Sequence, residues 1–151
     1  MKNITQDLKE NVLLKKECLD KAKSQLKEEF IGIDKVIDDL IDSFSYWYFF
    51  PELQKKPVII NLWGLTGVGK TSLVSRLISL LDYNKRFFRF NLSEGEWDIK
   101  QTLTEIYDNK SASDFILLLD EFQHVRTLDE DGREKTSKYQ FIWDLLDTGK
   151  V

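Results

Sequence analysis

The segment that most constrains this chain is Gly64–Thr71, which reads GLTGVGKT. It matches the pattern G-x-x-x-x-G-K-[ST] at every position, and it lies between a short apolar run and a helix-like apolar pattern. Glycines let backbone N–H groups turn toward a polyphosphate, and the following helix directs its positive end to the same place. The context predicts a phosphate-binding loop rather than a glycine turn with a surface lysine.

Two side chains at the end of this loop have predicted roles in binding a nucleotide. Lys70 neutralises the β- and γ-phosphates, and we also assign it a catalytic role. The Thr71 hydroxyl is a predicted ligand of Mg²⁺. The cofactors that this motif predicts are therefore ATP and Mg²⁺.

A second motif, Phe115–Glu121, reads FILLLDE, an apolar run that ends in two carboxylates. Ligands of open α/β sheets bind at the carboxyl ends of the strands, where such a run delivers its charges. Asp120 is the predicted second metal residue, acting through water, and Glu121 is the predicted catalytic base that polarises the attacking water. The alternative is an ordinary strand end with a helix cap. Because phosphoryl-transfer kinases exclude water, a water-polarising glutamate favours hydrolysis.

Strand-like and helix-like patterns alternate after residue 57, which predicts an α/β fold with a parallel sheet. Short apolar runs predict three strands, and longer periodic segments predict helices. The predicted strands are 58–63, 87–92 and 115–120. Three helices are predicted after the loop, the second over 97–107 and the third ended by Gly149. The apolar residues of the first are Leu73, Val74, Leu77, Ile78 and Leu81, and those of the third are Tyr139, Ile142, Trp143 and Leu146.

Two helices are predicted before the sheet. The first covers residues 1–28 and carries an apolar stripe, for which we favour packing on this chain or a partner helix over a membrane surface. The second begins at Asp34 as its cap and ends in an aromatic run closed by Pro51, for which we favour core or interface over base stacking. The stripes consist of Ile4, Leu8, Val12, Leu19, Ala22 and Leu26, and of Val36, Ile37, Leu40, Ile41 and Phe44.

Composition narrows the functional class. The chain has 151 residues and a net charge of −4, which argues against a globally basic nucleic-acid-binding protein. No apolar run approaches the roughly 20 residues that span a bilayer, and the N-terminus lacks the apolar region of a secretory signal. We therefore expect a cytoplasmic protein that does not enter a membrane. The small basic cluster of Lys85, Arg86 and Arg89 reads as a solvated edge, with DNA contact as the alternative.

At these motifs the chain resembles the AAA+ ATPases, nearest to the Clp/HSP100 branch. Gly64–Thr71 is similar to the branch's G-P-T-G-V-G-K-T, and Leu119–Glu121 is similar to its L-D-E. Leu92–Glu94 lies where those proteins carry M-S-E, and residues 141–150 resemble their L-L-Q-V-L-D-D-G-R helix end. Residues 30–34 resemble the I-G-Q-D segment that contacts adenine. The resemblance covers about residues 30–150.

The resemblance implies a sheet of order 5-1-4-3-2 with helices on both faces, and a homo-oligomer whose active sites lie at subunit interfaces. It also implies adenine contacts from Ile31 and Gly32. It divides the chain into an N-terminal helical extension, 1–29, and a partial ATPase core, 30–151. The complete set of predicted nucleotide-binding residues is Ile31, Gly32, Gly64, Thr66, Gly67, Val68, Gly69, Lys70, Thr71 and Ser72.

The chain also departs from that branch. Between Glu94 and Phe115 there is no aromatic-Val-Gly pore loop. The fourth strand with its sensor asparagine, the arginine finger and the helical lid fall after Val151. Since two buried strands need the fourth strand as a hydrogen-bonding partner, we expect the 151 residues to be part of a longer protein.

The leading functional hypothesis is an oligomeric Mg²⁺-dependent ATPase that drives a conformational change, with protein partners, in a prokaryotic antiviral defence or mobile-element setting. One alternative is a nucleotide-gated switch or scaffold that binds ATP without appreciable turnover. Another is an ATP-dependent DNA-binding factor, whose affinity falls steeply with salt. We assign no catalytic role to Cys18, His124, Arg126 or Arg133.

Overall fold

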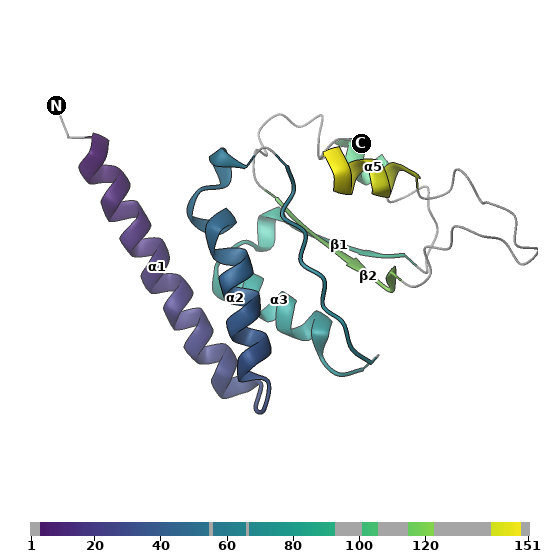
Figure 1. Ribbon diagram of the computed structural model, residues 1–151, viewed down its shortest axis with the longest axis horizontal. Helices are drawn as coiled ribbons and strands as arrows, with labels where there is room; N and C mark the ends of the chain where they lie inside the picture. The colour runs from purple at the N-terminus through teal and green to yellow at the C-terminus, as the bar shows by residue number, and fades with distance from the viewer. Residues whose placement is uncertain are drawn as a thin grey trace, which may run out of the picture. The chain divides into compact units, whose positions relative to one another are not determined.

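The computed structural model describes residues 4–54, 56–65, 67–92, 101–105, 115–122 and 140–148 (Figure 1). The chain forms two compact units, and each is described by itself. Unit 1 comprises Met1–Gln54 and Ile60–Lys85, and unit 2 comprises Lys55–Ile59 and Arg86–Val151.

Unit 1 begins with a helical hairpin. Helix α1 (Ile4–Glu29) packs along helix α2 (Asp34–Phe49), as Figure 1 shows. The three- and four-residue spacing of the buried residues places them on one face of each helix. The predicted packing of the N-terminal helix on its own chain is therefore confirmed. The buried residues are Leu19, Ala22 and Leu26 of α1 and Ile37, Leu40, Ile41, Phe44 and Tyr48 of α2.

The first turns of α1 depart from the predicted stripe. Leu8 has the spacing of a buried residue, yet 59% of it is exposed. Helix α1 has 26 residues and α2 has 16, and the Lys15 ammonium already reaches the carbonyl oxygen of Phe49 at the end of α2. The prediction is wrong for Leu8 because α1 extends past the helix that covers it.

Among the described helices, none is long and apolar enough to cross a membrane.

Two predictions about the start of α2 are also wrong. Ile33 occupies the N-cap position, no side chain caps the helix, and Asp34 is the first helical residue. An acidic side chain there is favourable because the first turn carries the positive end of the helix dipole. Val36 is exposed, since the buried face of α2 begins at Ile37.

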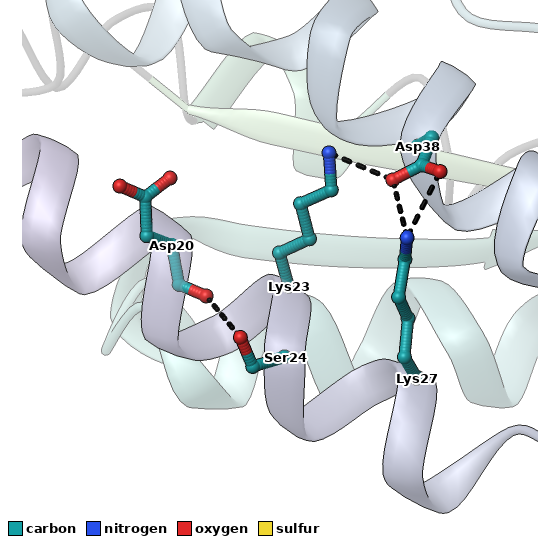
Figure 2. A network of polar contacts seen from close by, with 5 residues as sticks. All are labelled: Asp20, Lys23, Ser24, Lys27 and Asp38. Atoms are coloured by element: carbon teal, nitrogen blue, oxygen red, sulfur yellow. Dashed lines mark hydrogen bonds and ion pairs between the residues drawn. The ribbon is translucent and has the colours of Figure 1, made fainter.

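Ion pairs join the two helices of the hairpin. Figure 2 shows the Asp38 carboxylate of α2 facing two lysines of α1, with the Lys23 and Lys27 ammonium groups each 2.7 Å from Oδ1. The hydrogen bonds from Lys23 and then Lys27 hold the pKa of Asp38 below its usual value. The hydrogen bond to Asp38 is likewise the main cause of the raised pKa of Lys23. These shifts keep the groups charged at neutral pH.

The aromatic end of α2 packs within unit 1. Phe44 and Tyr48 are buried, and the Tyr83 ring centroid lies 5.7 Å from that of Trp47 and 5.8 Å from that of Tyr48. The predicted core role of the aromatic run is confirmed for Phe44 and Tyr48. Burial raises the pKa of the Tyr48 hydroxyl to about 12, with smaller contributions from Cys18 and Tyr83.

Helix α3 (Lys70–Leu80) completes the core of unit 1. Its apolar positions recur at helical spacing, as predicted, and Leu73, Leu77 and Ile78 are buried. Helix α3 packs on α1, and a short 3-10 turn, η1 (Pro51–Leu53), follows α2. The phosphate-loop helix and the N-terminal helix therefore share one core.

Unit 2 contains a parallel two-stranded sheet, and both of its strands were predicted. Strand β1 (Phe87–Asn91) follows a 3-10 turn, η2 (Asn84–Arg86), and pairs with β2 (Ile116–Asp120). The register sets Phe87 opposite Ile116 and Asn91 opposite Asp120. Parallel pairing brings the carboxyl ends of the two strands to one edge.

Alternate residues of a strand point to the same face of a sheet. One face of this sheet packs against residues of two helical segments, 101–105 and 140–148. Helix α5 (Gln140–Thr148) forms where a helix was predicted, and its Ile142 is buried as predicted. Trp143 was predicted in that stripe but is partly exposed, and Leu145 is buried instead. Tyr139 and Gly149 lie outside the described residues. Around the buried Leu92, Leu103, Ile142 and Leu145 pack Phe88, Phe90, Phe115, Leu117, Leu119 and Leu146.

The strand predicted over residues 58–63 is wrong for this structure. In the described part of the chain the sheet consists of β1 and β2, and neither pairs with this segment. A strand requires a neighbour that takes its backbone hydrogen bonds, so apolar composition alone does not form one. Trp63, predicted in a buried strand, is 92% exposed.

Candidate functional site

The loop before α3 is built on glycines in the left-handed region. Gly67 has φ 82°, and Gly69, the N-cap of α3, has φ 86°. A Cβ at either position would meet no heavy atom within 4 Å, so the backbone angle, not crowding, favours glycine there. No side chain caps α3. Thr66 lies outside the described residues, and Val68 is exposed.

Lys70 bridges the two ends of this loop. Its Nζ donates hydrogen bonds to the carbonyl oxygens of Gly64, at 2.8 Å, and Leu65, at 2.6 Å. The first intrahelical bond runs from the Leu73 N–H to the Gly69 oxygen, at 2.9 Å. A helix directs the N–H groups before that bond, and its positive end, toward whatever lies ahead of its first turn.

These features fit a bound polyphosphate with a hard cation. The positive end of α3, the Lys70 ammonium and open space beside the glycines suit an anion. Thr71 and Ser72 stand in the first turn of α3, where Thr71 offers a hydroxyl to a metal. Among the described residues no cluster of three or more acidic, histidine or cysteine side chains forms a metal site. Mg²⁺ fits such a chain because it takes few protein ligands and keeps water and phosphate oxygens.

The predicted adenine segment lies in the turn between α1 and α2. Gly32 has φ 87°, and the neighbouring Ile31 is 89% exposed. An isoleucine side chain with so much free surface offers apolar area to a flat base. The adenine contact itself stays a prediction.

The acidic pair stands at the carboxyl end of β2. Asp120 is its last residue, and the Asp120 carbonyl accepts a hydrogen bond from the Leu92 N–H at 3.0 Å, which ties the ends of both strands. Oδ1 of Asp120 accepts the Glu121 N–H at 3.0 Å. Glu121 has φ 58°, a left-handed conformation that costs a non-glycine residue about 1–2 kcal/mol. The chain therefore turns sharply where the predicted base stands.

Arg89 is the residue at this end of the sheet that sequence reasoning missed. Its Nη2 lies 2.8 Å from Oδ2 of Asp120. In the register, Arg89 is opposite Leu118 and Asn91 is opposite Asp120, so Arg89 and Asp120 share a face as diagonal neighbours. Arg89 is exposed, as expected of a solvated edge, but its ion pair with Asp120 was not predicted. A signal in the sequence could have indicated this ion pair. Arg89 lies two residues before the end of one predicted strand, and Asp120 ends the neighbouring parallel strand.

The structure groups the predicted residues in two sets. Unit 1 holds the phosphate loop together with Ile31 and Gly32, and unit 2 holds Asp120 and Glu121. The Glu94 position, His124, Arg126 and Arg133 lie outside the described residues. The catalytic, metal and nucleotide assignments therefore stay predictions that rest on residue chemistry and on each set's own geometry.

Comparison with known proteins identifies the family. No curated protein and no solved structure matches this chain. The sequence model of the family described as "ATPase family associated with various cellular activities (AAA)" matches residues 60–148. The match begins just before the phosphate loop and extends through the acidic pair to the last residue of α5. It covers more than half of the chain, and this protein therefore belongs to the AAA family.

Proposed function

We propose that this chain binds Mg²⁺-ATP and hydrolyses its β–γ phosphoanhydride bond. The observation that carries the proposal is the loop Gly64–Thr71, which opens directly into α3 through a left-handed Gly69 in a member of the AAA family. Lys70 stands at the junction and already faces the interior of the loop through its two carbonyl contacts.

Each polar residue of the two sets has one role in this proposal. Lys70 and the first-turn N–H groups hold the phosphates. Thr71 and Asp120 hold Mg²⁺, Asp120 through water, and the metal neutralises charge that builds up on the phosphate oxygens. Glu121 accepts a proton from the attacking water.

The test separates binding from turnover. Glu121→Gln should keep ATP affinity within about twofold and lower hydrolysis by at least 100-fold, since general bases contribute about 10²–10⁴-fold. Lys70→Ala should abolish binding. The matched control is Glu10→Gln on the exposed part of α1, which should change neither quantity. A Glu121→Gln protein that hydrolyses ATP at the wild-type rate would exclude this assignment.

The finer part of the proposal rests on the resemblance to the Clp/HSP100 branch. It comprises a sheet of order 5-1-4-3-2, a homo-oligomer with active sites between subunits, protein partners, and a cytoplasmic role in antiviral defence or a mobile element. Parallel pairing of β1 with β2 supports one part of this order. The order numbers the strands predicted over 87–92 and 115–120 as second and third, and it sets them side by side. Light scattering with and without ATP and Mg²⁺ tests the oligomer.

A second candidate is a nucleotide-gated switch that binds ATP and barely hydrolyses it. The observation that favours it is the Arg89–Asp120 ion pair, which occupies an oxygen of the carboxylate proposed to face the metal. A turnover rate that stays near zero at high protein concentration, with tight ATP binding, would select this candidate.

A further inference from the structure

An ion pair links the end of α1 to the phosphate-loop helix. Arg76 of α3 donates from Nε to Oε2 of Glu29 and from Nη2 to Oε1, both at 2.7 Å. This two-bond arrangement fixes the carboxylate relative to the guanidinium in direction as well as distance. The Gln25 side-chain amide adds a hydrogen bond to Oε1 at 3.0 Å, which orients Glu29 from its own helix.

Each group of this ion pair favours the charged form of the other. The hydrogen bond from Arg76 is the main cause of the lowered pKa of Glu29, and the same bond raises the pKa of Arg76. Both groups are thus charged near neutral pH. The apolar residues beside them are buried, Leu26 on α1 and Leu73 and Leu77 on α3. The pair therefore sits at the margin of a packed contact between the two helices.

Both residues of the ion pair lie close in the sequence to predicted nucleotide-binding residues. Glu29 is the last residue of α1, and the predicted adenine segment, Ile31–Gly32, begins two residues later. Arg76 follows Lys70 by six residues of continuous helix, about 9 Å along the axis. The pair thus anchors the start of the base segment to a fixed point on the helix that carries the phosphate-binding lysine.

We propose that the Glu29–Arg76 ion pair is a positioning device for the nucleobase: it holds the Ile31–Gly32 segment at a set distance from Lys70, so that base and phosphates are bound together. The inference rests on the proposed function, since it assumes that ATP is the ligand. Glu29 and Arg76 are positioning residues and act through the segment and the helix. Ile31 is 89% exposed, and no heavy atom lies within 4 Å of the Cβ position of Gly32, so little packing of the segment itself competes with this anchor.

The test compares Mg²⁺-ATP with Mg²⁺-tripolyphosphate, a probe that has the phosphates and no base. Calorimetric titrations of the full chain would use Glu29→Gln, Arg76→Gln and the charge-swapped double variant Glu29→Arg/Arg76→Glu. We expect each single variant to bind ATP roughly three- to tenfold more weakly and tripolyphosphate with unchanged affinity. The swapped variant should regain most of the ATP affinity.

Lys23→Gln provides the matched control. It removes an ion pair of similar exposure that joins α1 to α2 and does not involve α3. It should leave both affinities unchanged. If a Gln variant fails to fold by circular dichroism, Arg76→Lys keeps the charge without the two-bond geometry and should show the same selective loss.

Three outcomes would overturn the inference. Parallel loss of ATP and tripolyphosphate affinity would mean that the pair merely stabilises α3. Unchanged ATP affinity in both single variants would mean that the pair positions nothing. A wild-type protein that binds neither ligand would overturn the proposed function itself, and this result is distinct because it appears before any variant is made.

Discussion

Two individual residues, one in the phosphate loop and one after β2, have backbone angles in the left-handed region. Gly69 has φ 86° at the N-cap of α3, and Glu121 has φ 58° directly after β2. Gly69 lies at the start of α3, directly before Lys70, and Glu121 lies at the end of β2, directly after Asp120. Glycine adopts such angles freely, whereas Glu121 does so at an energetic cost that its neighbours must offset.

Gly69→Ala should lower the free energy of unfolding by about 1–2 kcal/mol, since alanine is strained at positive φ while space around it is open. It should also weaken ATP binding, because the loop can relax only by turning its N–H groups away. Urea denaturation and calorimetry measure the two effects. Gly69→Asn is the control: asparagine tolerates this region better and should cost less stability. Equal stability of wild type and Gly69→Ala would contradict the assigned backbone strain.

Arg89→Met should lower the Mg²⁺ concentration needed for half-maximal ATP binding several-fold. The reason is that the Arg89 guanidinium lies 2.8 Å from an Asp120 oxygen and competes with a cation there. A Mg²⁺ titration of fluorescent-nucleotide binding provides the readout. The exposed Lys85→Met removes a positive charge four residues earlier in the sequence and should leave the titration unchanged. A wild-type Mg²⁺ requirement in Arg89→Met would show that the pair does not compete.

At the scale of elements, contacts to one aromatic residue, Tyr48 of α2, join α1 to α2. The Lys15 ammonium lies 5.5 Å from the Tyr48 ring centroid and donates to the Tyr48 carbonyl at 2.9 Å. The Tyr83 ring packs edge-on to the Tyr48 ring, with their centroids 5.8 Å apart. The end of α2 is therefore held by cation–π, hydrogen-bond and packing contacts from two other segments.

Tyr48 should ionise at an unusually high pH. Its pKa of about 12 in the folded chain exceeds the ordinary value of 10.0 because burial disfavours the phenolate. The contribution of Tyr48 to stability is complete below pH 10 and is lost progressively as pH rises toward 12. An absorbance titration near 295 nm would show the late step, and Tyr48→Phe should remove it. Tyr46→Phe, at an exposed position, is the control and should leave the late step in place.

Much of the element pattern could be predicted from local sequence. The alternation of apolar residues with charged ones located α1, α2, α3 and α5, and the two apolar runs at 87–92 and 115–120 became β1 and β2. These predictions succeeded because each depends on a residue's own neighbours along the chain. The left-handed glycines of the loop were likewise implied by the motif.

The predictions that failed depend on partners distant in sequence. Residues 58–63 have strand composition, but strand formation needs a pairing neighbour that composition does not reveal. Leu8 has the right periodicity, but its burial depends on where α2 ends. Arg89 is exposed as predicted, but its ion pair was not predicted, because Asp120 is brought close only by the register of β1 and β2. Tertiary contacts, not propensity, decide all three.

Over the whole molecule, the family match and the compact units do not share a boundary. The match begins at residue 60, whereas unit 1 joins residues 60–85 to α1 and α2. The buried Leu73 and Leu77 of α3 belong to the same unit as Leu26 of α1, and α3 packs on α1. The N-terminal helices are thus part of the structure that supports the phosphate loop.

A chain shortened to begin at residue 55 should therefore lose soluble, folded protein, because it uncovers the apolar face of α3. Size-exclusion chromatography and binding of an apolar dye would report this change. A chain that begins at residue 12 is the control, since residues 6–11, the removed part whose burial is described, are exposed throughout, and Lys15 and Leu19 are kept. Both shortened chains behaving like the full chain would show that α3 does not need the hairpin.

The contacts of Lys70 bear on how fast a ligand is captured. A free lysine side chain explores many rotamers, and a ligand that binds it must halt that motion. Here two carbonyl oxygens of the loop already confine the ammonium at 2.8 and 2.6 Å. Arrival of an anion would then exchange one set of oxygen partners for another over a short path. Most of the entropy loss at this side chain precedes the encounter, which favours rapid association over a slow search for the bound conformation.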